Sequence, residues 1–192
     1  MDRPRIIDIG CSSGISTLES ARLSQGKIIE IDIDQPALDK FERSIKEGGL
    51  TDQVGAVNCS MLYMYFLDES FDIIWSKGSI YAIGFEKGLR EWRRFLKPSS
   101  FILVHDEQGN VDDKIEQISN CGYELLDYFI LSIEIWWAEY FAPLQKLIDE
   151  SGTRYTNDLK FLEELRQAQG ELNMFKKHHE RNSSVCFVMK KN

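Results

Sequence analysis

An apolar run that ends in a glycine-bearing turn constrains the fold of this chain more than any other feature. The run IIDI leads into the turn GCSSG, so that the whole segment covers residues 6–14. A turn of this kind, followed by a helix, points backbone N–H groups at a bound ligand. A second apolar run ends in Asp32, about 18 residues after Gly14, where a carboxylate can accept hydrogen bonds from a ribose diol. Together these features predict one half of a nucleoside-binding α/β sheet.

The charge beside the turn indicates which nucleoside is bound. Turns that bind dinucleotides have the pattern G-x-G-x-x-G, which lets a pyrophosphate approach the helix N-terminus. Here Asp8 stands two residues before Gly10, and a carboxylate at that place repels a pyrophosphate. It suits a ligand that carries an ammonium group. S-adenosylmethionine has one on its methionine end, together with the ribose that Asp32 would hold.

The pattern Asp8-x-Gly10-x-Ser12-x-Gly14 resembles the first motif of the class I S-adenosylmethionine-dependent methyltransferases, D-x-G-x-G-x-G. Ser12 takes the place of the middle glycine. The resemblance implies that Asp8, Gly10 and Gly14 contact the methionine end of the cofactor, that Asp32 binds the ribose hydroxyls, and that Ile33 packs on the adenine. The alternatives are an ordinary strand-to-helix turn for the glycines and a surface acid for Asp32.

Two further stretches belong to the expected cofactor site. The family often has an acid after its third strand, where this chain has Cys59-Ser60-Met61-Leu62; Ser60 and the backbone of Met61 would take its place, or Ser60 is a plain loop residue. Ser76 and Lys77 follow an apolar strand and so lie at the carboxyl edge of the sheet, where ligands bind in such folds. The expected cofactor-binding residues are therefore Asp8, Gly10, Cys11, Ser12, Gly14, Asp32, Ile33, Ser60, Met61, Ser76 and Lys77.

The order of apolar runs and amphipathic segments predicts the fold class. Strands and helices alternate, which favours an α/β architecture with a parallel sheet between two helical layers. We expect a Rossmann-like three-layer α/β/α sandwich, and the resemblance adds an antiparallel last strand to a seven-stranded sheet. The expected strands are 5–10, 27–33, 54–58, 70–76, 101–104, 123–131 and 184–189, and the expected helices between them are 15–24, 36–47, 86–96 and 111–120.

Residues 132–182 form an insertion between the last two strands of what we otherwise expect to be a single domain, residues 1–192. The insertion is rich in aromatic residues and then helical, and it is a candidate lid. Its apolar stripe, at intervals of three and four residues, predicts a helix that packs on this domain; a homodimer seam is the alternative. Family members commonly carry helices before the first strand. Either the start of this chain is truncated, or something else closes the site.

Composition excludes several classes of partner. The 192 residues are 43% hydrophobic and carry a formal net charge of −8, so we expect one ordinary core and no nucleic-acid partner. No apolar run approaches the roughly 20 residues of a membrane span, and the start does not resemble a signal peptide. The four cysteines lack C-x-x-C spacing, which is typical of a reduced, cytoplasmic protein. His178-His179 lack a partner at ligand spacing, so no metal site is expected.

Methyl transfer requires alignment of the acceptor, exclusion of water and, for some acceptors, removal of a proton. The candidate bases are His105, Asp106, Tyr81 and Glu139; His105 can be uncharged near neutral pH, although a structural role is the alternative. The aromatic residues of the insertion could form a wall for an organic or cationic acceptor, or they could fill the core of the insertion; these are Trp136, Trp137 and Tyr140.

The sequence therefore favours an enzyme that transfers the methyl group of S-adenosylmethionine to a small-molecule acceptor by in-line displacement. A non-catalytic S-adenosylmethionine-binding or interaction protein is the alternative, because Ser12 and the missing acid after the third strand depart from the family pattern. A nicotinamide-dependent oxidoreductase is disfavoured by Asp8 and by the expected antiparallel last strand.

Overall fold

The computed structural model describes residues 2–10, 14–151, 159–177 and 183–192. The chain forms two compact units. The first, here called the sheet unit, comprises Met1–Phe129 and Cys186–Asn192, and the second, here called the helical unit, comprises Ile130–Val185. The insertion expected at 132–182 falls within the helical unit; its action as a lid stays a prediction.

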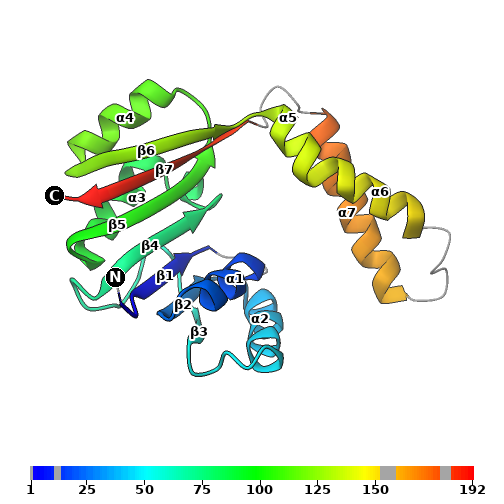
Figure 1. Cartoon of the computed structure of the whole chain (residues 1–192), viewed down its shortest axis with the longest axis horizontal. Helices are drawn as coiled ribbons and strands as arrows, with labels where there is room; N and C mark the ends of the chain where they lie inside the picture. Colours follow the sequence, from blue (N-terminus) through cyan, green and yellow to red (C-terminus); the bar gives the residue numbers. More distant parts are fainter. Residues whose placement is uncertain (1, 11–13, 152–158, 178–182) are drawn as a thin grey trace. The chain divides into compact units, whose positions relative to one another are not determined.

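Seven strands form one sheet in the order β3-β2-β1-β4-β5-β7-β6. Neighbouring strands from β3 to β5 pair in parallel, and β7 runs opposite to β5 (Figure 1). The strands are β1 (Arg5–Ile9), β2 (Lys27–Asp32), β3 (Val54–Asn58), β4 (Phe71–Lys77), β5 (Leu96–Glu107), β6 (Tyr123–Leu131) and β7 (Ser184–Lys191). This topology confirms the expected Rossmann-like fold with an antiparallel last strand.

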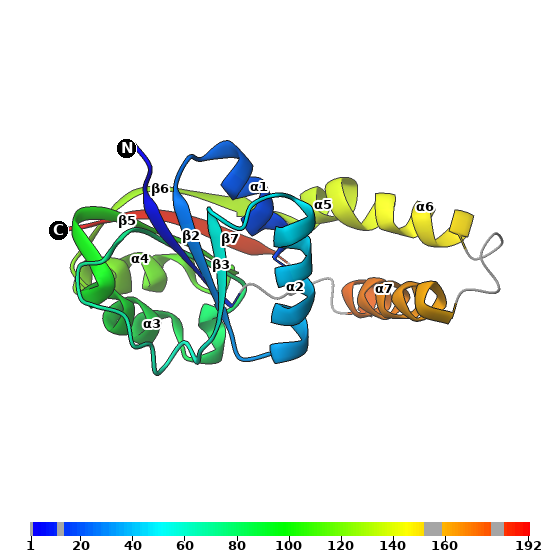
Figure 2. The same cartoon turned by 90° about the horizontal axis from the view of Figure 1, so that it is seen from below.

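Helices cover both faces of the sheet. Figure 2 shows α1 and α2 on one side and α3 and α4 on the other. Their bounds are α1 (Ile15–Leu23), α2 (Gln35–Glu47), α3 (Phe85–Trp92) and α4 (Val111–Asn120), with short turns η1 (Ile80–Ala82) and η2 (Arg93–Phe95). The N-caps explain where two of them begin: the side chain of Asp34 accepts a hydrogen bond from the Ala37 N–H, and that of Asn110 from the N–H groups of Asp112 and Asp113, which satisfies otherwise unpaired donors.

The alternation of side chains along each strand divides the core between the two faces. On one face Ile6 and Ile28 pack with Phe41, Ile45 and Val54, all 5% exposed or less. Each fully buried side chain of this size contributes roughly 1.5–3 kcal/mol to folding. This packing fixes α2 against the strands that end at the glycine turn and at Asp32.

The fifth strand is longer than expected, because β5 begins at Leu96 and not at Phe101. Its pairing with β4 shifts register between Phe71, which faces Leu96, and Ile73, which faces Phe101. The irregularity contains Pro98, which cannot donate to a ladder, and Ser99, whose φ is 58°. A bulge tolerates a proline that a regular central strand does not.

The helical unit contains α5 (Ile133–Trp136), the π-helical turn η3 (Trp137–Phe141), α6 (Ala142–Ser151) and α7 (Leu159–Lys177). Its core consists of Phe141, Leu172 and Phe175. The ring of Phe175 stacks on Phe141, with centroids 3.8 Å apart, and on Trp137 at 6.3 Å. The predicted helical stripe thus packs within this unit. The sequence favours Asn157 or Asp158 as the N-cap of this helix, and both lie outside the described residues.

The aromatic side chains of the insertion take part in the same packing. Trp136 packs against the core and donates its indole N–H to Ser184 Oγ at 3.0 Å, and the Tyr140 hydroxyl lies 3.3 Å from Glu171 Oε2. The Lys176 ammonium already lies 5.6 Å from the centroid of the Trp137 ring. These contacts favour the core alternative over an aromatic wall. Within the described part of the chain, no helix is both long and apolar enough to cross a bilayer.

Candidate functional site

A cavity of about 380 Å³ lies at the carboxyl edge of the sheet unit. Cavities that bind small molecules commonly measure about 300–1,000 Å³ and are largely apolar. The lining brings together the turn after β1, the ends of β2 and β3 and the loop after β4; its residues are Gly10, Ile31, Asp32, Ile33, Cys59, Ser60, Met61, Leu62, Gly78, Ser79, Tyr81, Ala82 and Ile83. Six residues expected at the site, Gly10, Asp32, Ile33, Ser60, Met61 and Tyr81, therefore share one cavity.

The two glycines of the turn are required by the packing of the protein itself. Gly10 has a φ of 73°, and a Cβ there would lie 2.4 Å from the Cβ of Ser79. Gly14 has a φ of 67°, and a Cβ there would lie 2.2 Å from the Phe41 ring. Positive φ values disfavour any other residue. Cys11 and Ser12, also expected at the site, lie outside the described residues.

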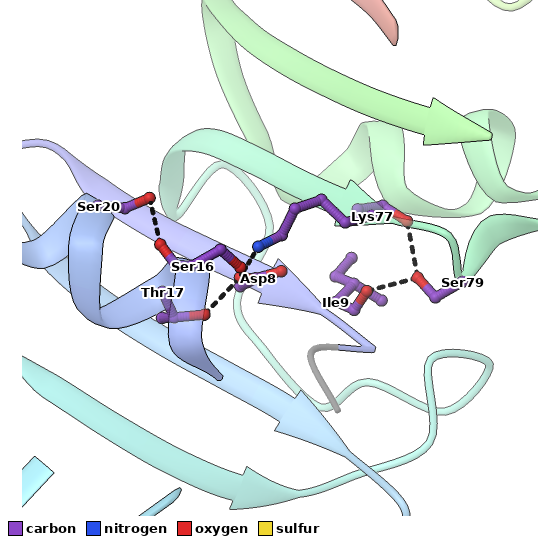
Figure 3. A network of polar contacts seen from close by, with 8 residues as sticks. Asp8, Ile9, Ser16, Thr17, Ser20, Lys77 and Ser79 are labelled. Carbon is purple, nitrogen blue, oxygen red and sulfur yellow. Dashed lines mark hydrogen bonds and ion pairs between the residues drawn. The ribbon is translucent and has the colours of Figure 1, made fainter. Parts of the chain in front are cut away.

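Ser79 connects the glycine turn with the loop after β4, a role that sequence reasoning did not find. Its hydroxyl donates to the Ile9 carbonyl oxygen at 2.5 Å (Figure 3) and lies 2.8 Å from the Ser76 hydroxyl. Ser76 and Ser79 are both buried. A serine 70 positions from its partner leaves no local signal in the sequence. Ser76, expected to bind cofactor, thus acts on the turn through Ser79.

Asp8 lies under α1 and does not line the cavity. It is 3% exposed, its Oδ2 accepts a hydrogen bond from the Thr17 hydroxyl at 2.6 Å, and the Lys77 ammonium lies 3.7 Å from the same oxygen (Figure 3). Burial raises the pKa of the Asp8 carboxyl above its ordinary value, whereas Lys77 and Thr17 act in the opposite direction. Lys77 also lies 5.3 Å from the centroid of the Trp75 ring.

Glu30 is a buried acid beside Asp8. The two residues are register partners on β2 and β1, Glu30 is 0% exposed, and neither of its carboxyl oxygens has a hydrogen-bond partner among the described residues. Burial, and then the charge of Asp8, raise the pKa of Glu30 to about 9. Glu30 is therefore uncharged at neutral pH. The signal was a charged residue inside the apolar run IIEI, which sequence reasoning passed over.

The ends of β2 and β3 are joined at the cavity. Asp32 Oδ1 accepts from the Asp34 N–H at 2.9 Å, the Asp32 carbonyl from the Cys59 N–H at 3.0 Å, and the Ile33 carbonyl from Asn58 Nδ2 at 3.2 Å. These contacts orient the Asp32 carboxylate, while Ile33 remains 73% exposed. An oriented carboxylate and an exposed apolar side chain suit a ribose and a base, respectively.

The loop after β3 is also fixed by hydrogen bonds. Ser60 Oγ accepts from the Leu62 N–H at 3.3 Å, and the Met61 carbonyl accepts from the Trp92 indole at 3.1 Å. The side chain of Trp92 is fully buried. The cavity wall that Ser60, Met61 and Leu62 form is thereby anchored to α3.

The candidate bases lie in different places. Tyr81 lines the cavity and is 65% exposed, and His105 is the register partner of Lys77 on β5. Burial, followed by the charge of Lys77, lowers the pKa of His105, although Asp106 acts in the opposite direction. Asp106, another candidate base, forms an ion pair with the Lys114 ammonium at 2.6 Å. Glu139 belongs to the helical unit, where it is exposed.

Comparison with known proteins identifies the family. Residues 6–99 match a family model described as a methyltransferase domain. This segment is a class I methyltransferase domain. S-adenosylmethionine is the cofactor of that family. The methyltransferase domain includes the glycine turn, Asp32 and all of the described residues that line the cavity.

A relative with a named activity is the ubiquinone/menaquinone biosynthesis C-methyltransferase UbiE of Vibrio campbellii. It is 26% identical over 117 residues, which make up 59% of this chain and 45% of the relative. This chain spans less than half of the length of the curated relatives with which it was compared.

Solved structures share the fold of the methyltransferase domain. Phosphoethanolamine N-methyltransferase 2 of Haemonchus contortus, in complex with S-adenosyl-L-methionine, has a TM-score of 0.79 at 15% identity, over 99% of this chain and 49% of that one. The cyclase SpnF has a TM-score of 0.75 at 18% identity, over 99% of this chain and 76% of that one. Because this fold also carries a cyclase, the fold alone does not fix the reaction.

Proposed function

We propose that this chain binds S-adenosylmethionine in the cavity of the sheet unit and transfers its methyl group to a small-molecule acceptor. The observation that carries the proposal is the convergence of Gly10, Asp32 and Ile33 on one cavity. These residues come from two neighbouring strand ends, and each suits a different part of an adenosine ligand. The family match, residues 6–99, supports the same cofactor.

The residues present fit the cofactor. Asp32 would accept hydrogen bonds from the ribose hydroxyls, because an ionised carboxylate offers about four acceptor positions. Ile33 and Leu62, which are 73% and 40% exposed and line the cavity, would pack on the adenine. When bound, S-adenosylmethionine supplies an electrophilic methyl group on a sulfonium ion. Ser60 would contact the base through its hydroxyl.

The chain's own contribution to the reaction is positioning and removal of a proton. An acceptor beside the strand ends of β4 and β5 would lie near Tyr81 and His105, and the lowered pKa of His105 leaves its imidazole uncharged at neutral pH. A neutral imidazole can accept a proton as the acceptor loses it. Tyr81 would orient the acceptor. We keep Glu139 as a third candidate.

A small-molecule acceptor is supported by the relatives. The names of the Vibrio and Haemonchus enzymes refer to quinone biosynthesis and to phosphoethanolamine, and the cavity is of a size that suits a small ligand. The proposal includes a cytoplasmic location, and it is compatible with a homodimer.

Calorimetry with the purified chain tests the proposal. S-adenosylmethionine should bind and NAD should not; a preference for NAD would remove the proposal. Asp32→Ala should weaken binding by roughly 1.5–3 kcal/mol, the range for hydrogen bonds to a charged group, and Asp34→Ala, which removes only the α2 cap, serves as the matched control. Equal affinity of Asp32→Ala and the parent chain would exclude the ribose role.

A further inference from the structure

Lys77 is the basic residue nearest in sequence to the described lining of the cavity. Asp8 lies two residues before Gly10, and Lys77 directly precedes Gly78; both glycines line the cavity. Among the described residues that form the lining, none is a lysine or an arginine. A cation at this edge of the sheet is therefore supplied from β4, by the residue where that strand ends.

Asp8 acts as the anchor of this lysine and not as a surface that a ligand can reach. The Asp8 side chain is 5% exposed, against 23% for that of Lys77. Figure 3 shows the ammonium of Lys77 reaching from β4 toward Asp8 on β1, with Thr17 of α1 on the other side of the carboxylate. Asp8 Oδ2 accepts a hydrogen bond from the Thr17 hydroxyl and lies 3.7 Å from the Lys77 ammonium. Of these two charged side chains, that of Lys77 is therefore the more exposed.

Two further contacts hold Lys77 in place. Its ammonium lies 5.3 Å from the centroid of the Trp75 ring, a range in which a cation is attracted to an aromatic face. Directly after it, the Gly78 N–H donates to the His105 carbonyl at 2.8 Å, and Gly78 adopts a φ of 63°. The chain thus turns immediately after Lys77, which keeps the lysine at the strand end.

The charge of the cluster permits a negatively charged group beside Lys77. Asp8 and Lys77 cancel each other, and the second acid of the cluster, Glu30, is uncharged at neutral pH because burial and Asp8 raise its pKa to about 9. Were both acids ionised, the cluster would be negative and would repel an anion. A lysine carries three donors, so that an ammonium paired with one carboxylate can bind a second.

From this geometry we propose that Lys77, held by Asp8 and Thr17, binds the α-carboxylate at the methionine end of the cofactor and so selects ligands that carry an intact amino-acid group. The inference rests on the proposed function, since it assigns a contact within the same site. In this proposal Asp8 is a positioning residue: it orients Lys77, and Lys77 contacts the ligand.

Binding of two ligands that differ in one group tests the assignment. S-adenosylmethionine and decarboxylated S-adenosylmethionine share the adenosine, the sulfonium and the amino group, and differ in the carboxylate. We expect the parent chain to bind S-adenosylmethionine about 10- to 100-fold more tightly, as for a charge-assisted hydrogen bond. Equal binding of the two by the parent chain would overturn the inference without any substitution.

Substitution of Lys77 should abolish this preference. Lys77→Met keeps an unbranched side chain and removes the charge, so the affinity ratio of the two ligands should fall to about one. Lys77→Arg should retain the preference. The ratio is insensitive to a loss of folded protein, because both ligands report on the same folded fraction. An equal loss of affinity for both ligands would show a merely structural lysine and overturn the inference. An equal gain for both would show that Lys77 competes with the ligand's ammonium for Asp8, which also overturns it.

A third ligand separates this inference from the proposed function. 5′-Methylthioadenosine lacks the whole amino-acid group, so its affinity should be the same for the parent chain and for Lys77→Met. If it binds and the carboxylate preference is absent, only the role of Lys77 fails. If no adenosine ligand binds to the parent chain, the proposed function fails, and the inference fails with it.

Discussion

Asp8 and Glu30 are register partners on neighbouring parallel strands, and both carboxyl groups lie inside the protein, 3% and 0% exposed. Lys77, 3.7 Å from Asp8, offsets one negative charge. Two adjacent acids and one lysine are neutral as a group only if one acid keeps its proton. Lys77 and Thr17 both contact Asp8, whereas neither Glu30 oxygen has a hydrogen-bond partner in the part of the chain that the structure describes. Glu30 is therefore the acid that keeps its proton.

Glu30→Gln should make the chain more stable, and increasingly so as the pH rises. The folded pKa of Glu30 is about 9 against an ordinary 4.5, so the folded state holds one more proton than the unfolded state between these values. The free energy of unfolding of the parent chain therefore contains a contribution that is complete below about pH 4.5 and is lost as the pH rises toward 9. Glutamine has no such proton. In urea unfolding, the gain in free energy of unfolding of Glu30→Gln over the parent chain should be about 1–3 kcal/mol larger at pH 8 than at pH 5.

An exposed acid provides the control for this measurement. Glu42 lies on α2 with an exposed side chain, so that Glu42→Gln should leave the pH dependence of unfolding unchanged. The comparison cancels the contributions of the other acids, which are the same in both chains. Parallel pH profiles for the parent chain and for Glu30→Gln would contradict the buried, protonated state of Glu30.

Leu172→Ala should unfold the helical unit or weaken it by about 2–5 kcal/mol, the range for a buried leucine. Leu172 is 0% exposed and packs with Phe141 and Phe175, so its loss leaves a cavity among the stacked rings. Thermal unfolding followed by circular dichroism measures the effect. Met174→Ala on the same helix is the control, because Met174 is 60% exposed. Equal effects of the two substitutions would show that α7 does not pack as described.

Local patterns predicted the fold well, and contacts between distant segments account for what was missed. The apolar runs predicted β3 and β6, and the helical segment between them in sequence order predicted α4, all with the same bounds as the structure. Polar residues or glycine delimit each of these segments. The start of β5 was wrong, because a bulge absorbs Pro98 and the pairing with Phe71 lies across the sheet. A proline normally predicts the interruption of a strand, and the bulge that accommodates Pro98 is not evident from the sequence.

At the site, too, local spacing was predictable from the sequence and contacts between distant segments were not. The carboxyl ends of neighbouring parallel strands meet at one edge, so the spacing of Gly10 and Asp32 was enough to place both at one cavity. Ser79 could not be found in this way, since its contact with Ile9 spans 70 positions. The burial of Asp8 was also beyond reach, because it depends on where the side chains of Thr17 and Lys77 point.

Gly10→Ala should destabilise the sheet unit by more than the cost of its backbone conformation alone. A Cβ at this position meets the Ser79 Cβ at 2.4 Å, and Ser79 is held by the Ile9 carbonyl, so neither side can yield without breaking a buried hydrogen bond. Gly49→Ala isolates the backbone cost, because Gly49 has a similar φ of 66° and no atom within 4 Å of the added Cβ. We expect Gly49→Ala to cost about 1 kcal/mol and Gly10→Ala about 1–3 kcal/mol more, as for overpacking of a close-packed site. In urea unfolding, Gly10→Ala should cost less in a Ser79→Gly background than in the parent chain, because the opposing Cβ is then absent. If Gly10→Ala costs no more than Gly49→Ala, the turn is not held by Ser79, and the glycine at this position would serve the ligand alone.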